Sequence, residues 1–149
     1  MKIAVFASGE GTNLQALIDA CRSGRIRGQI SFVITNNPVA GALRRAARAG
    51  IESLVSLPKD FGSADEYNAS LAQACRQRGI ELICLAGFML QLKAPLLKAY
   101  QWRIMNIHPA LLPSFPGLHP QRQALQYGVK VSGATVHFVD EGVDTGPMI

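Results

Sequence analysis

One stretch near the N-terminus sets the architecture of this chain: Ile3-Ala4-Val5-Phe6-Ala7-Ser8-Gly9-Glu10-Gly11-Thr12-Asn13. Its first five residues form a continuous apolar run, which is typical of a strand buried on both faces. The two glycines then break the run. From Leu14 to Cys21 the apolar spacing is that of a helix, and Gly24 marks its end. The sequence therefore predicts a strand, a glycine-rich loop and a helix in that order.

The same alternation continues along the chain. Strands are predicted over residues 30–35, 53–57, 81–86, 103–108 and 132–139, and helices over 41–49, 64–78, 95–100 and 121–127. This order predicts an α/β fold with a Rossmann-like, doubly wound and mostly parallel sheet. The last residues, 144–149, read as a loop entering a further strand. We therefore expect one domain over residues 1–149 whose C-terminal part is missing.

Composition narrows the class of protein. The chain has 149 residues, of which 48% are hydrophobic and 17% charged, as in a globular domain with its own core. The net charge of +5 comes from scattered Lys and Arg. This pattern favours the binding of small anions over a continuous basic surface for nucleic acid. A basic solvated surface also explains the charge without any ligand. The three cysteines form no C-x-x-C pair, and the N-terminal apolar run is too short to span a membrane.

These features predict a cytoplasmic protein whose cysteines are buried thiols in a reducing compartment. No metal site is expected. We expect small-molecule partners, no nucleic acid, no membrane, and a monomer or a weak homodimer.

The glycine-rich loop is a candidate phosphate site. It places backbone N–H groups and the positive end of a helix dipole at one point, which suits an anion. Leu14 stands where a dinucleotide fingerprint requires its third glycine, and no Gly-Lys-Ser/Thr follows, so neither a dinucleotide site nor a P-loop is supported. Thr12 and Asn13 either bind a phosphate monoester or cap the helix.

The tetrapeptide Asn106-Ile107-His108-Pro109 is the candidate catalytic motif. Side chains two apart on a strand share a face, so Asn106 and His108 are expected to point to the same side. Pro109 ends the strand, which places an amide and an imidazole at the carboxyl end of the sheet, where open α/β sheets bind ligands.

Three other polar residues have more than one interpretation. We expect His137 to be structural or supporting and His119 to interact with a helix terminus. Asp144 lies between Gly142 and Gly146 and is either a solvated loop residue or a neighbour of His108. In the second case its charge would favour the imidazolium form, which can donate a proton or a hydrogen bond near neutral pH.

The segment from Asn106 to Pro113, continuing through Phe115-Pro116-Gly117, resembles the motif shared by the folate-dependent formyltransferase family. Segments 7–15, 86–89, 133–140 and 144–147 are similar to its glycinamide ribonucleotide branch, and the resemblance covers residues 1–149. It implies an enzyme of de novo purine biosynthesis that transfers the formyl group of its co-substrate, 10-formyltetrahydrofolate, to the amine of 5-phosphoribosylglycinamide.

The resemblance also implies roles for individual residues. Gly11, Thr12 and Asn13 would hold the ribonucleotide phosphate. Asn106 and protonated His108 would stabilise the oxyanion of a tetrahedral intermediate. Asp144 would keep His108 charged and position a water that relays a proton to the departing folate nitrogen, with His137 in support. The folate-binding residues would be Leu85, Met89, Leu90, Gln91, Leu92, Asn106, Val139 and Asp140.

Two departures from the family accompany this resemblance. Relatives often carry arginine at the positions of Ala64 and Leu90, so we expect weaker or different contacts there. Relatives also continue for some tens of residues, with further groups for the phosphate. The alternatives are a formyltetrahydrofolate hydrolase, a formyltransferase for another amine, or an inactive nucleotide-binding module. The turn at Gly11-Thr12-Asn13 argues against the first two, and only the missing C-terminal part favours the third.

Overall fold

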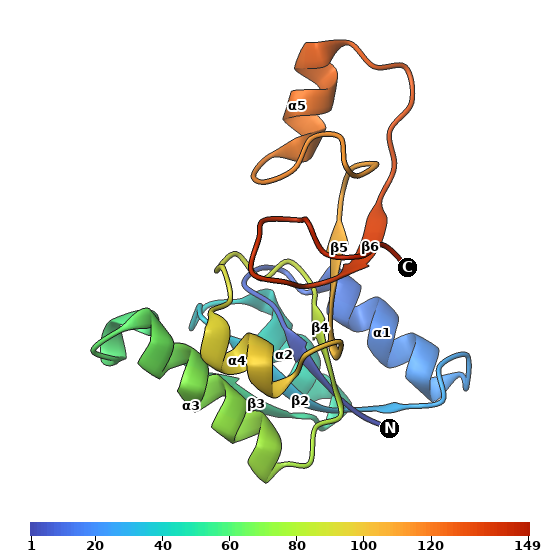
Figure 1. Ribbon diagram of the computed structural model, residues 1–149. Helices are drawn as coiled ribbons and strands as arrows, with labels where there is room; N and C mark the ends of the chain where they lie inside the picture. Colours follow the sequence, from blue (N-terminus) through green and yellow to red (C-terminus); the bar gives the residue numbers. More distant parts are fainter.

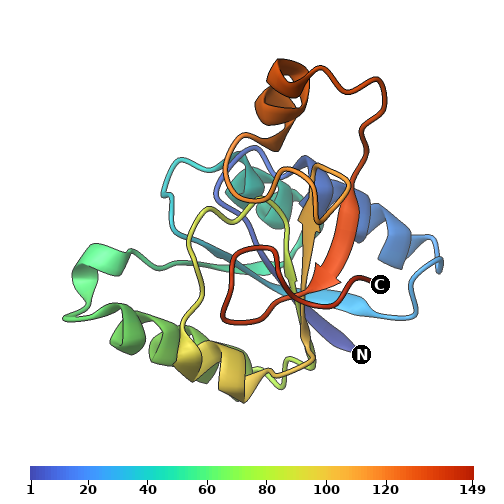
Figure 2. The same ribbon diagram turned by 45° about the horizontal axis from the view of Figure 1, so that its top comes forward.

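The computed structural model describes all residues from Met1 to Ile149 and contains one six-stranded sheet (Figures 1 and 2). The strands lie in the order β3-β2-β1-β4-β5-β6; the first five are parallel to their neighbours, and β6 is antiparallel to β5. The predicted doubly wound, mostly parallel sheet is confirmed. The strands are β1 (Lys2–Phe6), β2 (Gln29–Thr35), β3 (Glu52–Val55), β4 (Leu82–Leu85), β5 (Ile104–His108) and β6 (Thr135–Phe138).

Helices cover both faces of the sheet, which explains the continuous apolar runs of its strands. Alternate residues of β1 point to opposite faces. Phe6 packs in the core that contains Leu71, and Val5 packs in the core that contains Leu14. The first core lies under α3 (Ala64–Gln77) and α4 (Ala94–Ala99), and the second under α1 (Thr12–Arg22) and α2 (Gly41–Ala49); α5 (Pro120–Tyr127) and the short 3-10 helix η1 (Pro58–Asp60) complete the fold.

The last predicted strand is shorter than expected. Residues 132–139 were predicted to be extended, but β6 begins at Thr135 because its partner strand ends at His108, which pairs with Thr135. Residues 132–134 therefore have no neighbouring strand. The chain then returns along the free edge of β6, where the Phe138 N–H donates to the Pro147 carbonyl and the Ile149 N–H to the Val136 carbonyl. Residues 144–149 were predicted to enter a further strand; the structure shows an isolated antiparallel bridge between Met148 and His137 and no further strand.

Residues 109–134 form an extension that we call the arm. It rises from the carboxyl end of β5, carries α5 and returns to β6, and it stands away from the rest of the sheet in both views (Figures 1 and 2). Leu125 and Tyr127 on α5 are 81% and 80% exposed, so the arm has little core of its own. No helix of the chain is long and apolar enough to cross a membrane.

Candidate active site

The antiparallel pair β5–β6 brings Asn106 opposite His137. Asn106 Nδ2 lies 3.2 Å from His137 Nε2, and His137 Nδ1 lies 2.9 Å from the carbonyl oxygen of Phe138. A carbonyl can only accept, so Nδ1 carries the hydrogen and Nε2 accepts from the amide of Asn106. His137 is 2% exposed and fixes the orientation of that amide, whose second N–H remains available.

His108 and Asp144 lie together in the same site. His108 Nδ1 is 3.2 Å from Asp144 Oδ2, and the two side chains are 5% and 12% exposed. The carboxylate is also held by the arm, since Oδ2 accepts from the Gly117 N–H at 2.8 Å. Of the two interpretations of Asp144, the neighbour of His108 is the one that the structure shows.

Both ring nitrogens of His108 face acceptors. Nε2 lies 2.8 Å from the carbonyl oxygen of Phe115, and Nδ1 faces the Asp144 carboxylate. Neither acceptor carries a hydrogen to donate, so the arrangement satisfies both contacts only if both nitrogens are protonated. The geometry therefore favours an imidazolium paired with a carboxylate, a hydrogen-bond donor in a largely buried place.

Asp144 reaches this position through a tight turn. Its backbone has φ 54°, a left-handed conformation that aspartate tolerates better than most residues. The Asp140 carboxylate accepts from the Gly142 N–H at 3.0 Å and from the Thr145 hydroxyl at 2.7 Å, which closes the turn. A Cβ at Gly146 would lie 1.8 Å from the Phe138 carbonyl oxygen, so only glycine permits this approach to β6.

A cavity of about 730 Å³ lies at the carboxyl ends of β4 and β5. This volume is typical of sites that enclose a small organic ligand. Asn106, His108, His137 and Asp144 line it, and so does Asn13 from the glycine-rich loop. All the predicted folate-binding residues line the same cavity: Leu85, Met89, Leu90, Gln91, Leu92, Asn106, Val139 and Asp140.

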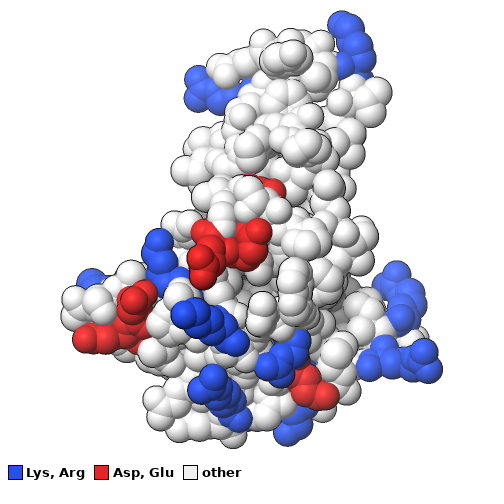
Figure 3. All heavy atoms as spheres, in the orientation of Figure 1, with Lys and Arg blue, Asp and Glu red and all other residues white.

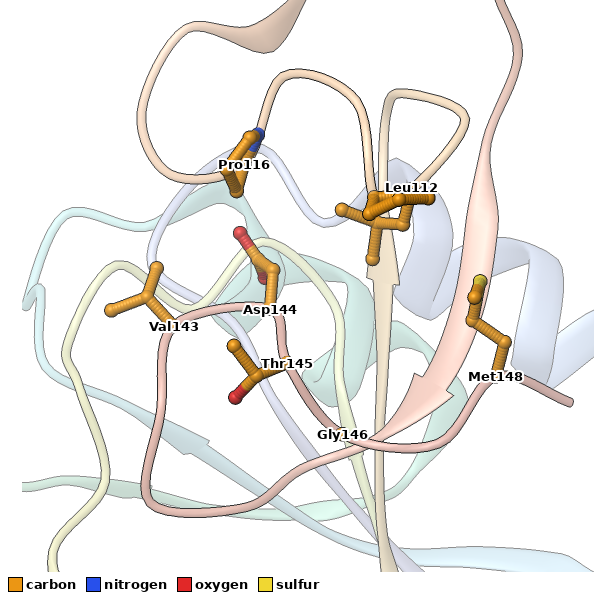
Figure 4. Close-up of a pocket in the computed structure, with 8 residues that line it drawn as sticks. Leu112, Pro116, Val143, Asp144, Thr145, Gly146 and Met148 are labelled. Carbon is orange, nitrogen blue, oxygen red and sulfur yellow. The ribbon is translucent and has the colours of Figure 1, made fainter.

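A second cavity of about 260 Å³ shares Val143 and Asp144 with the first. Figure 4 shows the carboxyl group of Asp144 directed toward the segment of Pro116, with Thr145 and Met148 farther along the same loop. Val143 and Asp144 are therefore the residues at which the two cavities meet.

One wall of the large cavity is made of unpaired backbone. The Met89 N–H donates to Ser8 Oγ and the Lys93 N–H to Asn68 Oδ1, whereas the N–H groups between them have no protein acceptor. Leu90, Gln91 and Leu92 thus present free donors and carbonyl acceptors beside the cavity. A planar ligand with alternating donors and acceptors can pair with such a segment.

The glycine-rich loop has the free donors of an anion site. Gly11 is the N-cap residue of α1 with φ 73°, and no side chain caps the helix. The interpretation of Thr12 and Asn13 as caps is therefore wrong, because both are exposed and neither side chain makes a hydrogen bond within the chain. A Cβ at position 11 would lie 2.8 Å from Ala42 Cα, so glycine is required for the close contact with α2.

Comparison with known proteins identifies the family of this chain. The family model described as formyl transferase matches residues 1–149. The chain belongs to the formyl transferase family. It is 42% identical to phosphoribosylglycinamide formyltransferase of Escherichia coli (strain K12), over 100% of this chain and 70% of that protein. It is also similar to a solved structure, glycinamide ribonucleotide transformylase 1 from Symbiobacterium toebii, with TM-score 0.99 and 51% identity over 100% of this chain and 70% of that one.

Other relatives are much longer. The chain is 53% identical to the trifunctional purine biosynthetic protein adenosine-3 of Drosophila melanogaster, over 99% of this chain and 11% of that protein. The chain thus spans about a ninth of the length of this relative.

Several contacts of this candidate site were missed in the sequence. The Phe115 carbonyl and the Gly117 N–H act through backbone atoms, which leave no mark in the residue pattern. The hydroxyl of Thr135 donates to the Ala110 carbonyl and accepts from the Leu112 N–H, so it ties the start of the arm to β6. His119 lines the cavity, and its side chain does not bond the helix terminus as predicted.

The two departures from the family fall in different places. Leu90 lines the large cavity, whereas Ala64 begins α3 and does not line it. A contact with a ligand in this cavity is therefore open to Leu90 and not to Ala64.

Proposed function

We propose that this chain carries the formyl-transfer site of a phosphoribosylglycinamide formyltransferase. The reaction moves the formyl group of 10-formyltetrahydrofolate to the amine of 5-phosphoribosylglycinamide, a step of de novo purine biosynthesis. The observation that carries the proposal is the single cavity that joins Asn106, His108 and Asp144 to Asn13 on one side and to the unpaired backbone of residues 90–92 on the other. The similarity to phosphoribosylglycinamide formyltransferases supports it.

The two substrates would bind to different elements around the cavity. The N–H groups at the start of α1 have no acceptor in the chain, so they and the helix dipole suit the ribonucleotide phosphate at Gly11, Thr12 and Asn13. The pterin would pair with the backbone of residues 90–92, with Leu85 and Val139 as apolar neighbours.

The chemistry would be acyl transfer through a tetrahedral intermediate. The amine nitrogen attacks the formyl carbon, and the carbonyl electron pair moves to oxygen. The free N–H of Asn106 and the imidazolium of His108 are the donors for that oxyanion, a contact whose removal typically costs about 3–4 kcal/mol. The intermediate collapses when the C–N bond to the folate breaks, and a water held by Asp144 carries a proton from the attacking amine to the departing nitrogen.

His108 has to exchange one protein partner before it donates to the substrate. Its contact with Asp144 is an ion pair between two largely buried groups, which is costly to break. Its other partner is the carbonyl of Phe115, a neutral acceptor in the exposed arm. We therefore assign Nε2 to the oxyanion, with the substrate oxygen taking the place of the Phe115 carbonyl.

The reaction needs only small molecules. We propose a cytoplasmic enzyme, a monomer or weak homodimer, that has no nucleic-acid or membrane partner and uses no metal. On the face shown in Figure 3, basic side chains lie in separate small groups and form no continuous stripe of the kind that binds nucleic acid.

The test is a transfer assay with the full-length protein, both substrates and the His108→Ala variant. We expect formylated ribonucleotide as the product of the wild type, a decrease of about 10²–10³-fold in kcat for the variant, and retained tetrahydrofolate binding. Free formate without formylated ribonucleotide would identify a hydrolase. Nucleotide binding without turnover would identify a binding module, and an unchanged kcat in the variant would remove His108 from the mechanism.

A further inference from the structure

The two halves of the proposed site meet where the strand order reverses. From β1 the chain proceeds through β2 to β3 on one side, and then returns to β4 on the other side of β1. The loops that follow β1 and β4 therefore leave the sheet toward opposite faces, which opens the crevice in which α/β proteins bind ligands. Ser8 follows β1, and Gly87 and Met89 follow β4.

Ser8 connects these two loops through nearly all of its polar groups. Its N–H donates to the Gly87 carbonyl at 3.0 Å, and its Oγ accepts from the Met89 N–H at 3.0 Å. The hydroxyl donates in turn to Asn36 Oδ1 at 2.6 Å, and the Asn37 side chain donates to the Ser8 carbonyl at 3.1 Å. Ser8 thus ties together the loops that follow β1, β2 and β4.

We propose that Ser8 is a positioning residue that couples the two substrate sites. It lies three residues before Gly11 in the phosphate loop, and its hydroxyl holds the residue that directly precedes the unpaired backbone of residues 90–92. A displacement of the phosphate loop is therefore transmitted through the Ser8 side chain to residues 90–92, the backbone that would bind the pterin. This inference rests on the proposed function and assigns a residue that the catalytic motif does not include.

The hydroxyl acts on the loops and not on a ligand. Ser8 does not line the large cavity, and its Oγ already donates once and accepts once. A hydroxyl can perform both functions at one atom, whereas an alanine performs neither and a thiol performs both weakly. The prediction is therefore specific to the hydroxyl group.

Steady-state kinetics of Ser8→Ala in the full-length protein test the proposal. Ser8→Ala removes two hydrogen bonds, of which the one from the Met89 N–H holds the pterin-binding backbone; losing that bond corresponds to about three- to ten-fold, which we expect as a rise in KM for 10-formyltetrahydrofolate with kcat changed by less than about two-fold. Ser8→Thr keeps the hydroxyl and should restore most of the affinity. Ser31→Ala is the matched control, because the Ser31 hydroxyl bonds only to the Gln29 carbonyl in the same strand.

A binding experiment tests the coupling itself. Tetrahydrofolate is titrated with and without saturating 5-phosphoribosylglycinamide, and the ratio of the two Kd values is compared between proteins. We expect the ratio to move toward one in Ser8→Ala and to stay at the wild-type value in Ser31→Ala. Asn36→Ala removes only the acceptor of the Ser8 hydroxyl. We expect it to move the Kd ratio in the same direction, by about half as much on a logarithmic scale. It serves as the test variant if Ser8→Ala does not fold.

The outcomes are distinct. An unchanged KM and an unchanged Kd ratio in Ser8→Ala overturn the proposal, as does a fall in kcat alone. If the wild-type protein itself transfers no formyl group, the proposed function fails and this inference fails with it.

Discussion

The sheet body, residues 1–108, and the arm differ in how they are packed. Phe6, Phe32 and Leu71 in the body are fully buried between the sheet and its helices. In the arm, Leu125 and Tyr127 are more than three-quarters exposed. Local stability follows buried apolar contact, so the body is expected to open only with global unfolding and the arm at much lower free energy.

The candidate site lies at the junction of these two regions. Asn106, His108 and His137 belong to the β5–β6 pair, whose hydrogen bonds fix their orientation. The two backbone partners, the Phe115 carbonyl and the Gly117 N–H, belong to the arm. The difference teaches that the two regions contribute different contacts to the candidate site: the strand pair fixes the orientation of the side chains, and the arm contributes backbone groups that, under the proposed function, a substrate would replace.

The largest expected difference between the regions is in thiol reactivity. Cys75 in α3 is fully buried, and burial raises the pKa of its thiol to about 12, so at pH 8 it is neither accessible nor ionised. A Leu125→Cys substitution places a thiol on the exposed face of α5. We expect a disulfide reagent to modify residue 125 at least about 10⁴-fold faster than Cys75, whose reaction requires unfolding. Mass spectrometry of digests assigns the modified positions.

The same thiol gives a pH dependence. Its folded-state pKa is raised above the ordinary value of 9.0, so its contribution to stability is complete below pH 9 and is lost as pH rises toward about 12. Urea unfolding between pH 8 and pH 11 measures this fall together with those of Cys84, Tyr67 and Tyr100, whose pKa values burial also raises. In the labelling experiment, similar modification rates at Cys75 and at a cysteine in position 125 would show that the body opens as easily as the arm.

The next effect concerns the contact between the regions. Asp144→Asn keeps the shape of the side chain and replaces the carboxylate that faces His108 Nδ1 with a neutral amide. We expect kcat to fall by about 10²-fold with tetrahydrofolate binding retained, because the oxyanion loses its charged donor. Asp19→Asn, at an exposed position of α1, is the control and should keep the wild-type kcat. A kcat within about three-fold of wild type in Asp144→Asn would contradict the ion-pair role.

The smallest effect concerns the attachment of the arm. Thr135→Val preserves shape but removes the bonds to the Ala110 carbonyl and the Leu112 N–H. Each lost bond lowers the free energy of local opening of the arm by about 1 kcal/mol. We therefore expect faster proteolysis within the arm and a kcat lower by about three- to ten-fold. Ser132→Ala is the control, since that side chain is exposed and bonds nothing. Unchanged proteolysis would show that Thr135 does not hold the arm.

The body could be predicted from the sequence because its signals are local. The apolar run from Ile3 to Ala7 reports burial on both faces, and the glycines after it report the turn into α1. The catalytic motif was equally readable, since Asn106 and His108 are two apart on one strand and share a face. The proximity of Asp144 was left open between two interpretations, and the tertiary structure was needed to choose between them.

The remaining features depend on contacts that residue types do not encode. Alternation of apolar and polar residues gives a strand no direction, so the antiparallel orientation of β6 was not derivable from its pattern. Ser8 looks like any serine before a glycine, and its importance comes from loops 28 and 81 residues away along the chain. Helix caps are also ambiguous, because the Thr12 and Asn13 side chains were suited to capping, whereas Gly11 takes the N-cap position and leaves α1 without a side-chain cap.

The register of β5 and β6 has a consequence for how such proteins diverge. His108 pairs with Thr135 and Asn106 with His137, so the two ends of the arm are held at a fixed separation whatever lies between them. Residues inserted or deleted between α5 and β6 lengthen or shorten a surface loop, which chains tolerate at small energetic penalty. A single deletion inside β6 would turn His137 to the opposite face of the sheet. The tip of the arm can therefore change in length, whereas the two-residue spacings from Asn106 to His108 and from Thr135 to His137 have to be kept.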